Sequence, residues 1–516
     1  MTKSYALPIG VSDYKELNEY YSADKTGMIA DILDDKAKVF LFCRPRRFGK
    51  TLNMTMLKAF FEKSDKATSC YFVNKEIWQK GEKYTKEQGK YPVIFLSFKD
   101  VKSKTFEAAM QVIYLLVSEE YGRHYSACKS LEGEDFRYYE SILSRRATQA
   151  EVEFSLKRLT RFLKELYGVP AIIIIDEYDT ALQTACTEGY YEDMIAFMRP
   201  FLSGGLKDNS NLKFGFLTGI TRVAKESIFS GLNNLMVDTI LSKKYGKYFG
   251  FTQNEVNEMA ALFEAEDKLS EIKEWYDGYI FGNDEIYNPW SVVNYFKNDC
   301  EPDSYWVSTA SNDILGQLIQ KANENGTDKL KLLYEGKSVD TIIEPHICYK
   351  DLEEDTNLLF SFLAISGYVK CTQPRMIDGE CYCKIKIPNS EIRWAYKKEI
   401  LSLTKKRYTM GLTGDITKAL VTGHTEEFLS LLKSFMLQTM SYYDATEGFY
   451  QGLMLTLCAL TTDFYRITSN RESGFGRFDF AFHQKSRVNQ GISLSSSAVA
   501  QTKTSGKRPV KVWSKS

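Results

Sequence analysis

The stretch from Val39 to Met54 restricts the possible folds of this chain more than any other. It reads VFLFCRPRRFGKTLNM. The apolar run before Arg44 predicts a short strand, and apolar residues recur at helical spacing after Thr51. A helix N-terminus directs free N–H groups and a partial positive charge toward an anion. A strand, a loop that ends in Gly-Lys-Thr and a helix therefore predict a phosphate-binding loop.

Each residue at the end of this loop has a chemical reason to be there. Gly49 lets the backbone approach a phosphate closely, Lys50 can reach the β- and γ-phosphates, and the Thr51 hydroxyl can ligate Mg²⁺. Arg44 stands where the usual motif has its first glycine, and Pro45 can fix the turn there by another route. On its own, the loop could equally be a surface turn. The candidate nucleotide-binding residues are Arg44, Pro45, Arg46, Arg47, Phe48, Gly49, Lys50 and Thr51.

A second motif supplies the acids that such a site needs. GVPAIIIIDEYDTAL contains four consecutive isoleucines, as expected of a parallel strand that is buried on both faces. Asp176 and Glu177 follow at its carboxyl end, where ligands bind in open α/β sheets. Asp176 is predicted to hold Mg²⁺ together with Thr51, and Glu177 to polarise the attacking water. The alternative is two solvated carboxylates after a core strand, but both motifs in this order favour a nucleotide site.

A third predicted strand, Lys213 to Leu217, leads into further polar residues. Thr218 can contact the γ-phosphate or the attacking water, and Arg222 can sense the γ-phosphate or act on a neighbouring subunit. The alternative is that Thr218 caps the next helix and that Arg222 pairs with a carboxylate. The candidate catalytic residues are thus Glu177, Thr218 and Arg222.

The composition sets limits on the function. The 516 residues predict two to four domains at roughly 100–200 residues each. Lys and Arg together number 67, as do Asp and Glu, so the net charge neither supports nor excludes nucleic acid as a partner. No apolar run of about 18 residues occurs, and no membrane partner is expected. The scattered cysteines and the lack of a visible signal peptide predict a cytoplasmic location.

Several segments together resemble a known family. LPIGVSDYKEL, YYSADKTGMIADIL, the RPRRFGKT loop, IIIIDEYDTAL and FGFLTGITRVAKESIFSGLNNL are similar to the AAA-ATPase-like family of bacteria and some archaea. WYDGYIFGNDEIYNPWSVVNYF, SFLAISGYV and RESGFGRFDF extend the resemblance, which runs from about Leu7 to about His483. In that family the RPRRFGKT form of the loop is the usual one. The resemblance implies ATP and Mg²⁺ as cofactors and a C-terminal nuclease-like domain of the PD-(D/E)XK superfamily.

The motifs and the resemblance together predict an α/β fold class with four parts along the chain. In the middle part, Asn288-Pro289 predicts a helix start and QPRMIDGECY a β-hairpin. The aromatic residues from Trp275 to Trp290 favour packing of a helical lid over stacking on nucleic-acid bases. The expected parts are an AAA-like P-loop ATPase domain of the additional-strand kind with a parallel sheet (1–250), a helical or winged-helix-like middle region (251–400), an incomplete restriction-endonuclease-like α/β domain (401–485) and a basic, Ser-rich, disordered tail (486–516).

The C-terminal part departs from the nuclease pattern. Asp479 matches the metal-binding acid of the nuclease-like relatives, and Glu447 is a candidate for an additional helical glutamate. The expected strand with Glu-x-Lys does not follow Lys485, and the tail beyond it has no acidic residue but six basic ones. Nuclease activity is therefore not expected, because the carboxylates that would complete a metal site are missing. One hypothesis is a shifted reading frame or a gene fusion near residue 486.

From these patterns we expect an ATP-binding protein, and more specifically a Mg²⁺-dependent ATPase that switches the conformation of its attached domains. One alternative is an ATP-regulated nuclease that acts on nucleic acid in defence or in mobile elements. Another is a nucleotide-binding scaffold without turnover. Arg222 acting on a neighbouring subunit would require an oligomer, which the sequence allows but does not indicate.

Overall fold

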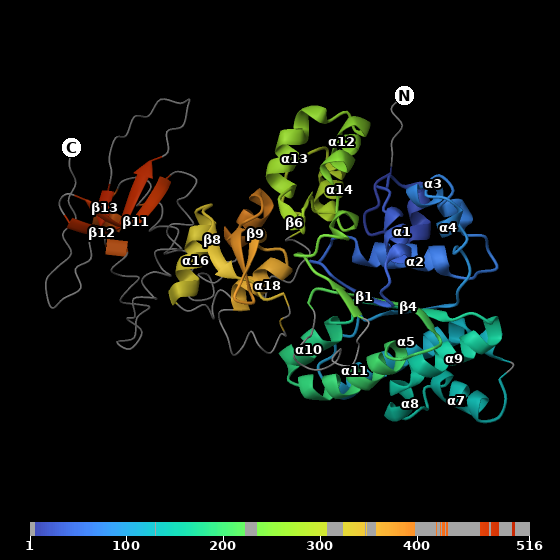
Figure 1. Ribbon diagram of the computed structural model, residues 1–516. Coiled ribbons are helices and arrows are strands. Elements are labelled where there is room, and N and C mark those ends of the chain that lie inside the picture. Colours follow the sequence, from blue (N-terminus) through green and yellow to red (C-terminus); the bar gives the residue numbers. More distant parts are fainter. Residues whose placement is uncertain are drawn as a thin grey trace. The chain divides into compact units, whose positions relative to one another are not determined.

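The computed structural model (Figure 1) divides into two compact units, residues 1–311 with 332–394 and residues 312–331 with 395–516. The expected domain boundary near residue 250 lies inside the first unit, and the one near residue 400 lies close to its end. The structure describes residues 6–129, 131–221, 235–306, 324–345, 347, 358–397, 419, 424, 426–428, 430–431, 465–473, 476–484 and 498–500.

A five-stranded sheet forms the centre of the first unit. All of its strand pairs are parallel, and the strand order is β2-β3-β4-β1-β5. β4 stands between β1 and β3, so the strand before the phosphate loop and the strand before the acids do not pair with each other. The parallel α/β class predicted from the sequence is confirmed. The strands are β1 (Val39–Cys43), β2 (Val93–Ser97), β3 (Ala171–Asp176), β4 (Leu212–Gly219) and β5 (Leu235–Asp238).

Both faces of this sheet are buried, and they carry different side chains. Successive strand residues point to opposite faces. On β1, Val39, Leu41 and Cys43 join a large hydrophobic core on one face. Phe40 and Phe42 turn to the other face, where Phe40 packs on Phe216 and Phe42 on Tyr245 at ring distances of 5.5 and 5.3 Å. The apolar run of β1 is therefore continuous because both faces of the strand are covered by other parts of the protein.

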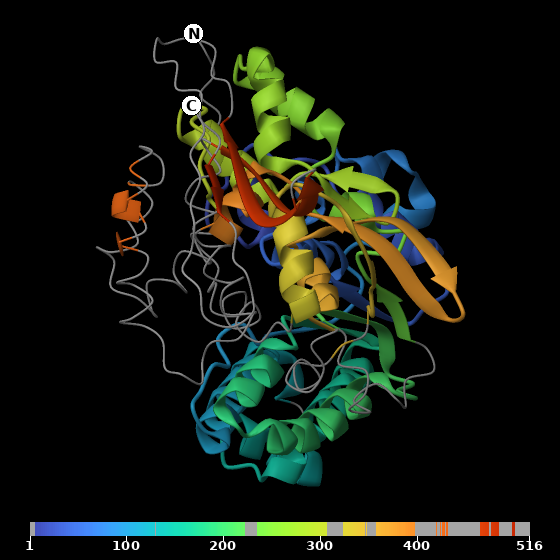
Figure 2. The same cartoon turned by 90° about the vertical axis from the view of Figure 1, so that its left-hand side faces the viewer.

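Two groups of helices cover these faces (Figures 1 and 2). In both views the helices of residues 106–206 lie on the side of the sheet opposite α1–α4. The first group has α1 (Gly27–Asp34), α2 (Lys50–Phe61), α3 (Glu76–Gln79) and α4 (Glu82–Thr85). The second has α5 (Phe106–Arg123), α6 (Tyr125–Cys128), α7 (Gly133–Leu143), α8 (Gln149–Glu153), α9 (Ser155–Tyr167), α10 (Thr180–Glu188) and α11 (Tyr191–Leu206). Among the described helices, none has the length and apolar composition of a membrane span.

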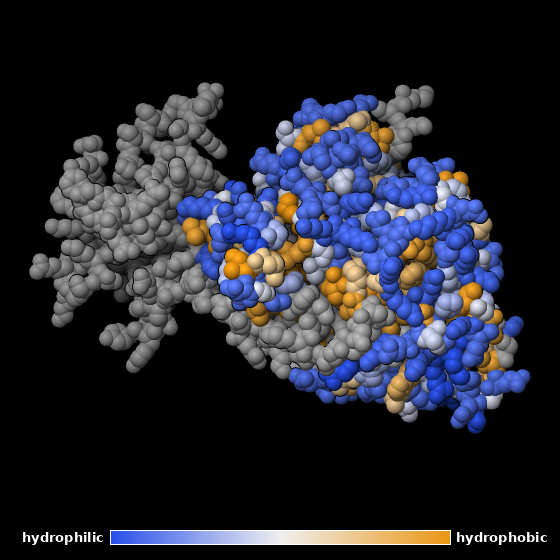
Figure 3. Space-filling view, viewed as in Figure 1, coloured by the Kyte–Doolittle hydropathy of each residue, from blue (hydrophilic) through white to orange (hydrophobic). Residues whose placement is uncertain are grey.

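The middle part of the first unit is helical with two small sheets. The predicted helix start is confirmed, because Asn288 caps α14 and Pro289 is its first residue. The predicted hairpin is confirmed as β9 and β10, which turn at residues 378–379, and β10 also pairs with β8. The residues coloured by hydropathy in Figure 3 are mostly hydrophilic on the face shown, with smaller hydrophobic areas. The elements are α12 (Gln253–Leu262), α13 (Leu269–Tyr276), β6 (Tyr279–Phe281), β7 (Asp284–Ile286), α14 (Pro289–Lys297), β8 (Val339–Ile342), α18 (Leu359–Ile365), β9 (Lys370–Ile377) and β10 (Glu380–Lys386).

The second unit contains an antiparallel sheet with the order β11-β12-β13. The strand predicted around Asp479 is present as β12 (Gly476–Gln484), and it forms a hairpin with β11 (Tyr465–Ser473). Part of the tail expected to be disordered, β13 (Ala498–Ala500), pairs with β12. Glu447 lies outside the described residues. Helix α16 (Glu324–Tyr334) crosses from the second unit into the first along the chain.

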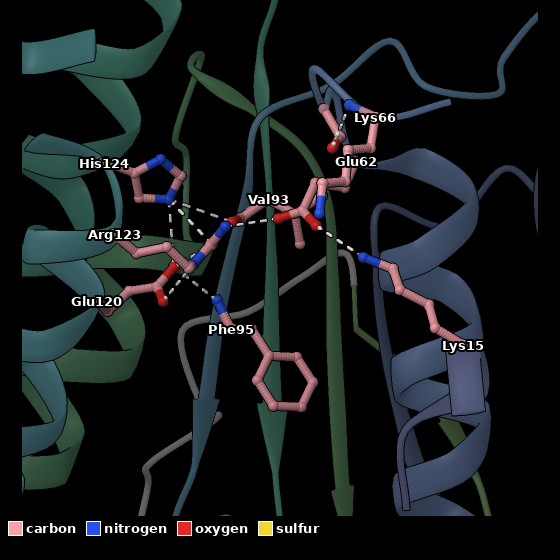
Figure 4. Close-up of polar contacts among 9 residues, drawn as sticks. Lys15, Glu62, Lys66, Val93, Phe95, Glu120, Arg123 and His124 are labelled. Carbon is pink, nitrogen blue, oxygen red and sulfur yellow. Dashed lines mark hydrogen bonds and ion pairs between the residues drawn. The ribbon is translucent and has the colours of Figure 1, made fainter. Parts of the chain in front are cut away.

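The outer edge of the large sheet is closed by side chains of α5 (Figure 4). β2 is an edge strand, and unpaired backbone groups on such a strand can recruit another chain. Glu120 accepts a hydrogen bond of 2.9 Å from the Phe95 N–H, and Arg123 donates to the Val93 carbonyl. Arg123 also pairs with Glu120 and with Glu62, at 2.5 Å in each case. These contacts satisfy backbone groups that a sixth strand would otherwise occupy.

The charge of Glu120 is maintained by its partners. Burial opposes ionisation, but hydrogen bonds from His124 and Arg123 outweigh it, so the pKa of Glu120 lies below its usual value. A depressed carboxyl pKa contributes stability above the pKa of the unfolded chain, which is about 4.3. That contribution is lost as the pH falls through the lower pKa of the folded protein.

We predict that Glu120→Gln lowers the free energy of unfolding at pH 7 by about 1.5–3 kcal/mol, because a charged hydrogen-bonding partner of Arg123 is removed. Urea unfolding followed by far-UV circular dichroism from pH 7 to pH 3 measures this. The usual pKa of a glutamate carboxyl is about 4.3. As the pH falls below that value, the unmodified protein should lose stability more steeply than the variant. The exposed neighbour Glu119 provides the control Glu119→Gln, and equal curves for the two variants would contradict the prediction.

Candidate functional site

Lys50 occupies the first turn of α2 and points back into the loop before it. Its Nζ donates to the carbonyl oxygens of Pro45 and Arg44, at 2.9 and 3.2 Å. Gly49, at the N-terminus of the helix, has φ of 77°, which glycine adopts without the clash of a Cβ atom. The ammonium group is buried but bonded only to neutral carbonyls, so it is placed to exchange them for an anion.

Asp176 connects this helix to the ends of two strands. Its Oδ2 accepts a hydrogen bond of 2.7 Å from Thr51 of α2, and its Oδ1 accepts one of 2.6 Å from Thr218 of β4. Asp176 is the last residue of β3 and is fully buried. The structure therefore brings together residues from three elements that are far apart in the sequence.

Glu177 is held beside Asp176 by its backbone. Its N–H donates to the Thr218 hydroxyl at 3.1 Å, and its φ of 52° lies in the left-handed region. That conformation disfavours a residue with a Cβ atom by about 1–2 kcal/mol. Strain of this kind gathers at functional sites, where the surrounding structure enforces it. Thr218 thus contacts the Asp176 carboxylate and the Glu177 backbone.

The site combines opposite charges in a poorly solvated place. Burial lowers the pKa of Lys50, and the nearby carboxylates of Glu177, Asp179 and Asp176 oppose that fall. Burial raises the pKa of Asp176, and the hydrogen bonds from Thr218 and Thr51 oppose that rise. A polyanion with its own divalent cation would compensate both kinds of charge at once.

Arg44 does not face this site with its guanidinium group. The side chain is fully buried, forms an ion pair with Asp238 at the end of β5, and donates to the Asp238 carbonyl at 3.0 Å. Its Cζ lies 4.9 and 5.1 Å from the ring centres of Phe249 and Phe281. The guanidinium charge of Arg44 is therefore neutralised by Asp238 in the interior, and Arg44 contacts Lys50 through its carbonyl oxygen.

Among the other predicted loop residues, Pro45, Phe48 and Arg47 contact the middle part of the chain, whereas the Arg46 side chain contacts α10. Pro45 lies against Gly367, where an added Cβ would approach it to 3.1 Å. Phe48 is buried with its ring 4.8 Å from that of Tyr279. Arg46 donates to the Gln183 side chain at 3.1 Å. Arg47 is placed over the ring of Trp290. The predicted packing of the aromatic segment on the ATPase part is present in these contacts.

Two acids that the sequence analysis did not single out support the site. Asp179 is buried and accepts hydrogen bonds from the Ile220 and Thr221 N–H groups, at 2.8 and 3.1 Å. It lies so close to Gly219 that a Cβ there would approach its Oδ1 to 2.8 Å. The available signal was a third acid in the DEYD run. The second missed acid is Asp238, the ion-pair partner of Arg44. Arg222 lies outside the described residues.

Two comparisons with known proteins bear on the family of this chain. Residues 8–229 match the family AAA-ATPase_like, described as "Predicted AAA-ATPase". This range includes all the site residues predicted from the first three motifs. The chain is also 24% identical over 447 residues to a protein of Azotobacter chroococcum mcd 1 described as "Uncharacterized protein in vnfD 5'region". That similarity covers 83% of this chain and 77% of the relative. The family match supports an AAA-ATPase-like protein and ends well before the C-terminal unit.

We predict that Arg44→Met lowers the free energy of unfolding by about 3–5 kcal/mol, because Asp238 is left buried without its cation. Replacing both partners, Arg44→Met with Asp238→Leu, should recover most of that loss, since no unpaired charge remains. Thermal and urea unfolding measure both variants against Arg137→Met, a change at an exposed position of α7. A single variant as stable as the Arg137 control would show that the ion pair is not structural.

Proposed function

We propose that this chain binds ATP with its phosphates at the loop of residues 44–51 and hydrolyses it. The observation that carries the proposal is the hydrogen bond of 2.7 Å between Thr51 and Asp176. It joins the end of the phosphate loop to the acidic end of a buried strand, and Lys50 lies beside it. The family match over residues 8–229 supports the same reading.

Each loop residue has a task in this proposal. Lys50 exchanges the carbonyls of Pro45 and Arg44 for phosphate oxygens, and the N–H groups at the start of α2 add further donors. Arg46 and Arg47 add positive charge near the phosphates. Arg44 contributes through its backbone and through the position that its ion pair gives to the loop.

Mg²⁺ fits the oxygen donors at this place. Thr51 and Asp176 would hold it, and the ion would neutralise charge on the transferred phosphoryl group. Within the described residues no group of three or more His, Cys, Asp or Glu side chains could hold a metal ion by itself. Mg²⁺ is commonly held by one or two protein ligands together with the substrate phosphates.

Hydrolysis needs a residue that positions and polarises the attacking water, and contacts that orient that residue. Glu177 is assigned to position and polarise the attacking water. Thr218 is assigned to hold the acids in place, since it contacts both, and it can touch the γ-phosphate from there. Arg222 remains the candidate for sensing the γ-phosphate. Turnover would then alter the packing between the loop and the middle part of the chain.

For the C-terminal unit, we keep the nuclease-like fold as a hypothesis. Asp479 falls on β12 of a small antiparallel sheet. The short β13 that pairs with β12 contains only Ala498–Ala500, without acid or lysine. Nucleic acid as a partner belongs to this hypothesis, whereas an oligomeric state is tied to Arg222 acting on a neighbouring subunit. The alternative of a nucleotide-binding scaffold without turnover differs from our proposal only in the role of Glu177.

We predict that Lys50→Ala abolishes ATP binding, because the buried ammonium group that faces the phosphates is lost. Isothermal titration with Mg·ATP measures this, and Lys36→Ala, at an exposed lysine before β1, should bind like the unmodified protein. Retained binding in Lys50→Ala refutes the assignment of the loop.

We further predict that Glu177→Gln keeps ATP binding but reduces phosphate release by about 100-fold or more, as expected when the residue that orients the water is disabled. The exposed Glu188 of α10 offers Glu188→Gln as a control. Radiolabelled ATP should remain bound to Glu177→Gln after gel filtration. If the unmodified protein binds ATP without turnover and Glu177→Gln behaves identically, the scaffold alternative is correct.

A further inference from the structure

The phosphate loop has an unusual conformation at a residue that is not glycine. Arg47 has φ of 68° and Gly49 has φ of 77°. Alternation of right- and left-handed backbone turns successive N–H groups toward one point and creates an anion-binding concavity. Gly49 adopts this conformation freely, but Arg47 is disfavoured in it by about 1–2 kcal/mol. Contacts from outside the loop must therefore hold Arg47 in place.

Trp290 provides one such contact. The Cζ atom of Arg47 lies 4.2 Å from the centre of the Trp290 ring. This places the guanidinium group against the π face that attracts it. Trp290 is itself fixed, because its Nε1 donates to the Tyr305 carbonyl at 3.2 Å. It is also the second residue of α14, whose first turn is capped by Asn288.

Trp306 provides the second contact, at the neighbouring loop residue. Its Nε1 donates to the Arg46 carbonyl at 3.1 Å. The indole is almost fully buried, with 1% exposed, and its ring lies 5.1 Å from that of Tyr368. Its backbone N–H donates to Glu391 at 2.6 Å. These contacts orient the indole toward the loop.

The two tryptophans form one assembly. Trp306 follows Tyr305, to which Trp290 is bonded. Ser291, the residue after Trp290, donates to the same Glu391 carboxylate at 2.8 Å. Arg46 and Arg47 are thus contacted from the side of the middle segment by two indoles, and the buried Glu391 carboxylate connects the Trp306 backbone with the residue after Trp290. Neither indole is needed to contact the phosphates.

We propose that Trp290 and Trp306 are positioning residues that keep Arg46 and Arg47 in the anion-binding conformation, so that the affinity of the loop for nucleotide phosphates depends on the middle segment. This inference rests on the proposed ATP binding. By linkage, a nucleotide that favours this conformation also strengthens the contacts to both indoles. The middle segment would in this way sense whether the loop is filled.

The proposal predicts an effect on binding more than on chemistry. Backbone N–H groups contact the phosphates in the ground state and in the transition state alike, so their misplacement raises KM and leaves kcat nearly unchanged. Trp290→Ala should weaken Mg·ATP binding by about 3- to 30-fold, the range expected for loss of a cation–π contact. Trp306→Phe should weaken it by about 2- to 12-fold through the lost hydrogen bond.

The test measures Kd, KM and kcat for Mg·ATP in the full chain. Trp394→Phe, at a tryptophan with 43% of its surface exposed, is the matched control. Far-UV circular dichroism and thermal melting confirm that each variant is folded. A purely structural role would reduce the amount of active protein, and so lower kcat at constant KM. That pattern, or binding by both variants equal to that of Trp394→Phe, overturns the proposal.

A double-mutant cycle isolates the contact between Arg47 and Trp290. Glycine adopts positive φ without an anchored side chain, so in the Arg47→Gly background Trp290→Ala should change Kd by less than about twofold. An equally large loss in both backgrounds would show that Trp290 does not act through Arg47. If the unmodified protein and Trp394→Phe bind no nucleotide, the proposed function fails, and this inference falls with it.

Discussion

The hydrogen bonds that Asp176 accepts from Thr51 and Thr218 are the interactions on which the site depends. They fasten the first turn of α2 to the ends of β3 and β4 at 2.7 and 2.6 Å. Parallel strands bring their carboxyl ends to one edge of a sheet, and with β4 between β1 and β3 the Asp176 carboxylate lies within reach of both hydroxyls. A buried carboxylate requires such partners. The strand order that brings the two hydroxyls to Asp176 therefore also determines the chemistry of the site.

The arginine in place of the first loop glycine is accommodated by packing. Its guanidinium group pairs with Asp238 and lies over Phe249 and Phe281. A glycine there would leave the buried Asp238 without its cation. The outer side of the loop is then covered by aromatic side chains of the middle segment. The loop is therefore packed within a larger core, and a movement of that core would displace the loop.

The sequence predicted the central elements well because their signals are local. The isoleucine run, the Gly-Lys-Thr end of the loop and the Asn-Pro helix start each depend on neighbouring residues. Asp238, Asp179 and Trp306 escaped prediction because their roles come from contacts across the fold. Asp238, for example, ends a strand of four residues and is 194 positions from Arg44. The role of Arg44 could not be predicted without that partner, whereas Thr218 could be singled out because it lies next to the carboxyl end of a clear strand. Arg222 and Glu447 lie outside the described residues, so their roles stay predictions.

The most direct test of the account is the dependence of binding on the number of phosphates. Isothermal titration of the unmodified protein with ATP, ADP and AMP, each with Mg²⁺, separates recognition of phosphates by the loop from recognition of the base. We expect ATP and ADP to bind at least about 100-fold more tightly than AMP, since the helix terminus, Lys50 and the metal all act on the β- and γ-phosphates. Equal affinity for the three nucleotides, or no binding of ATP, would contradict a phosphate site between Lys50 and Asp176.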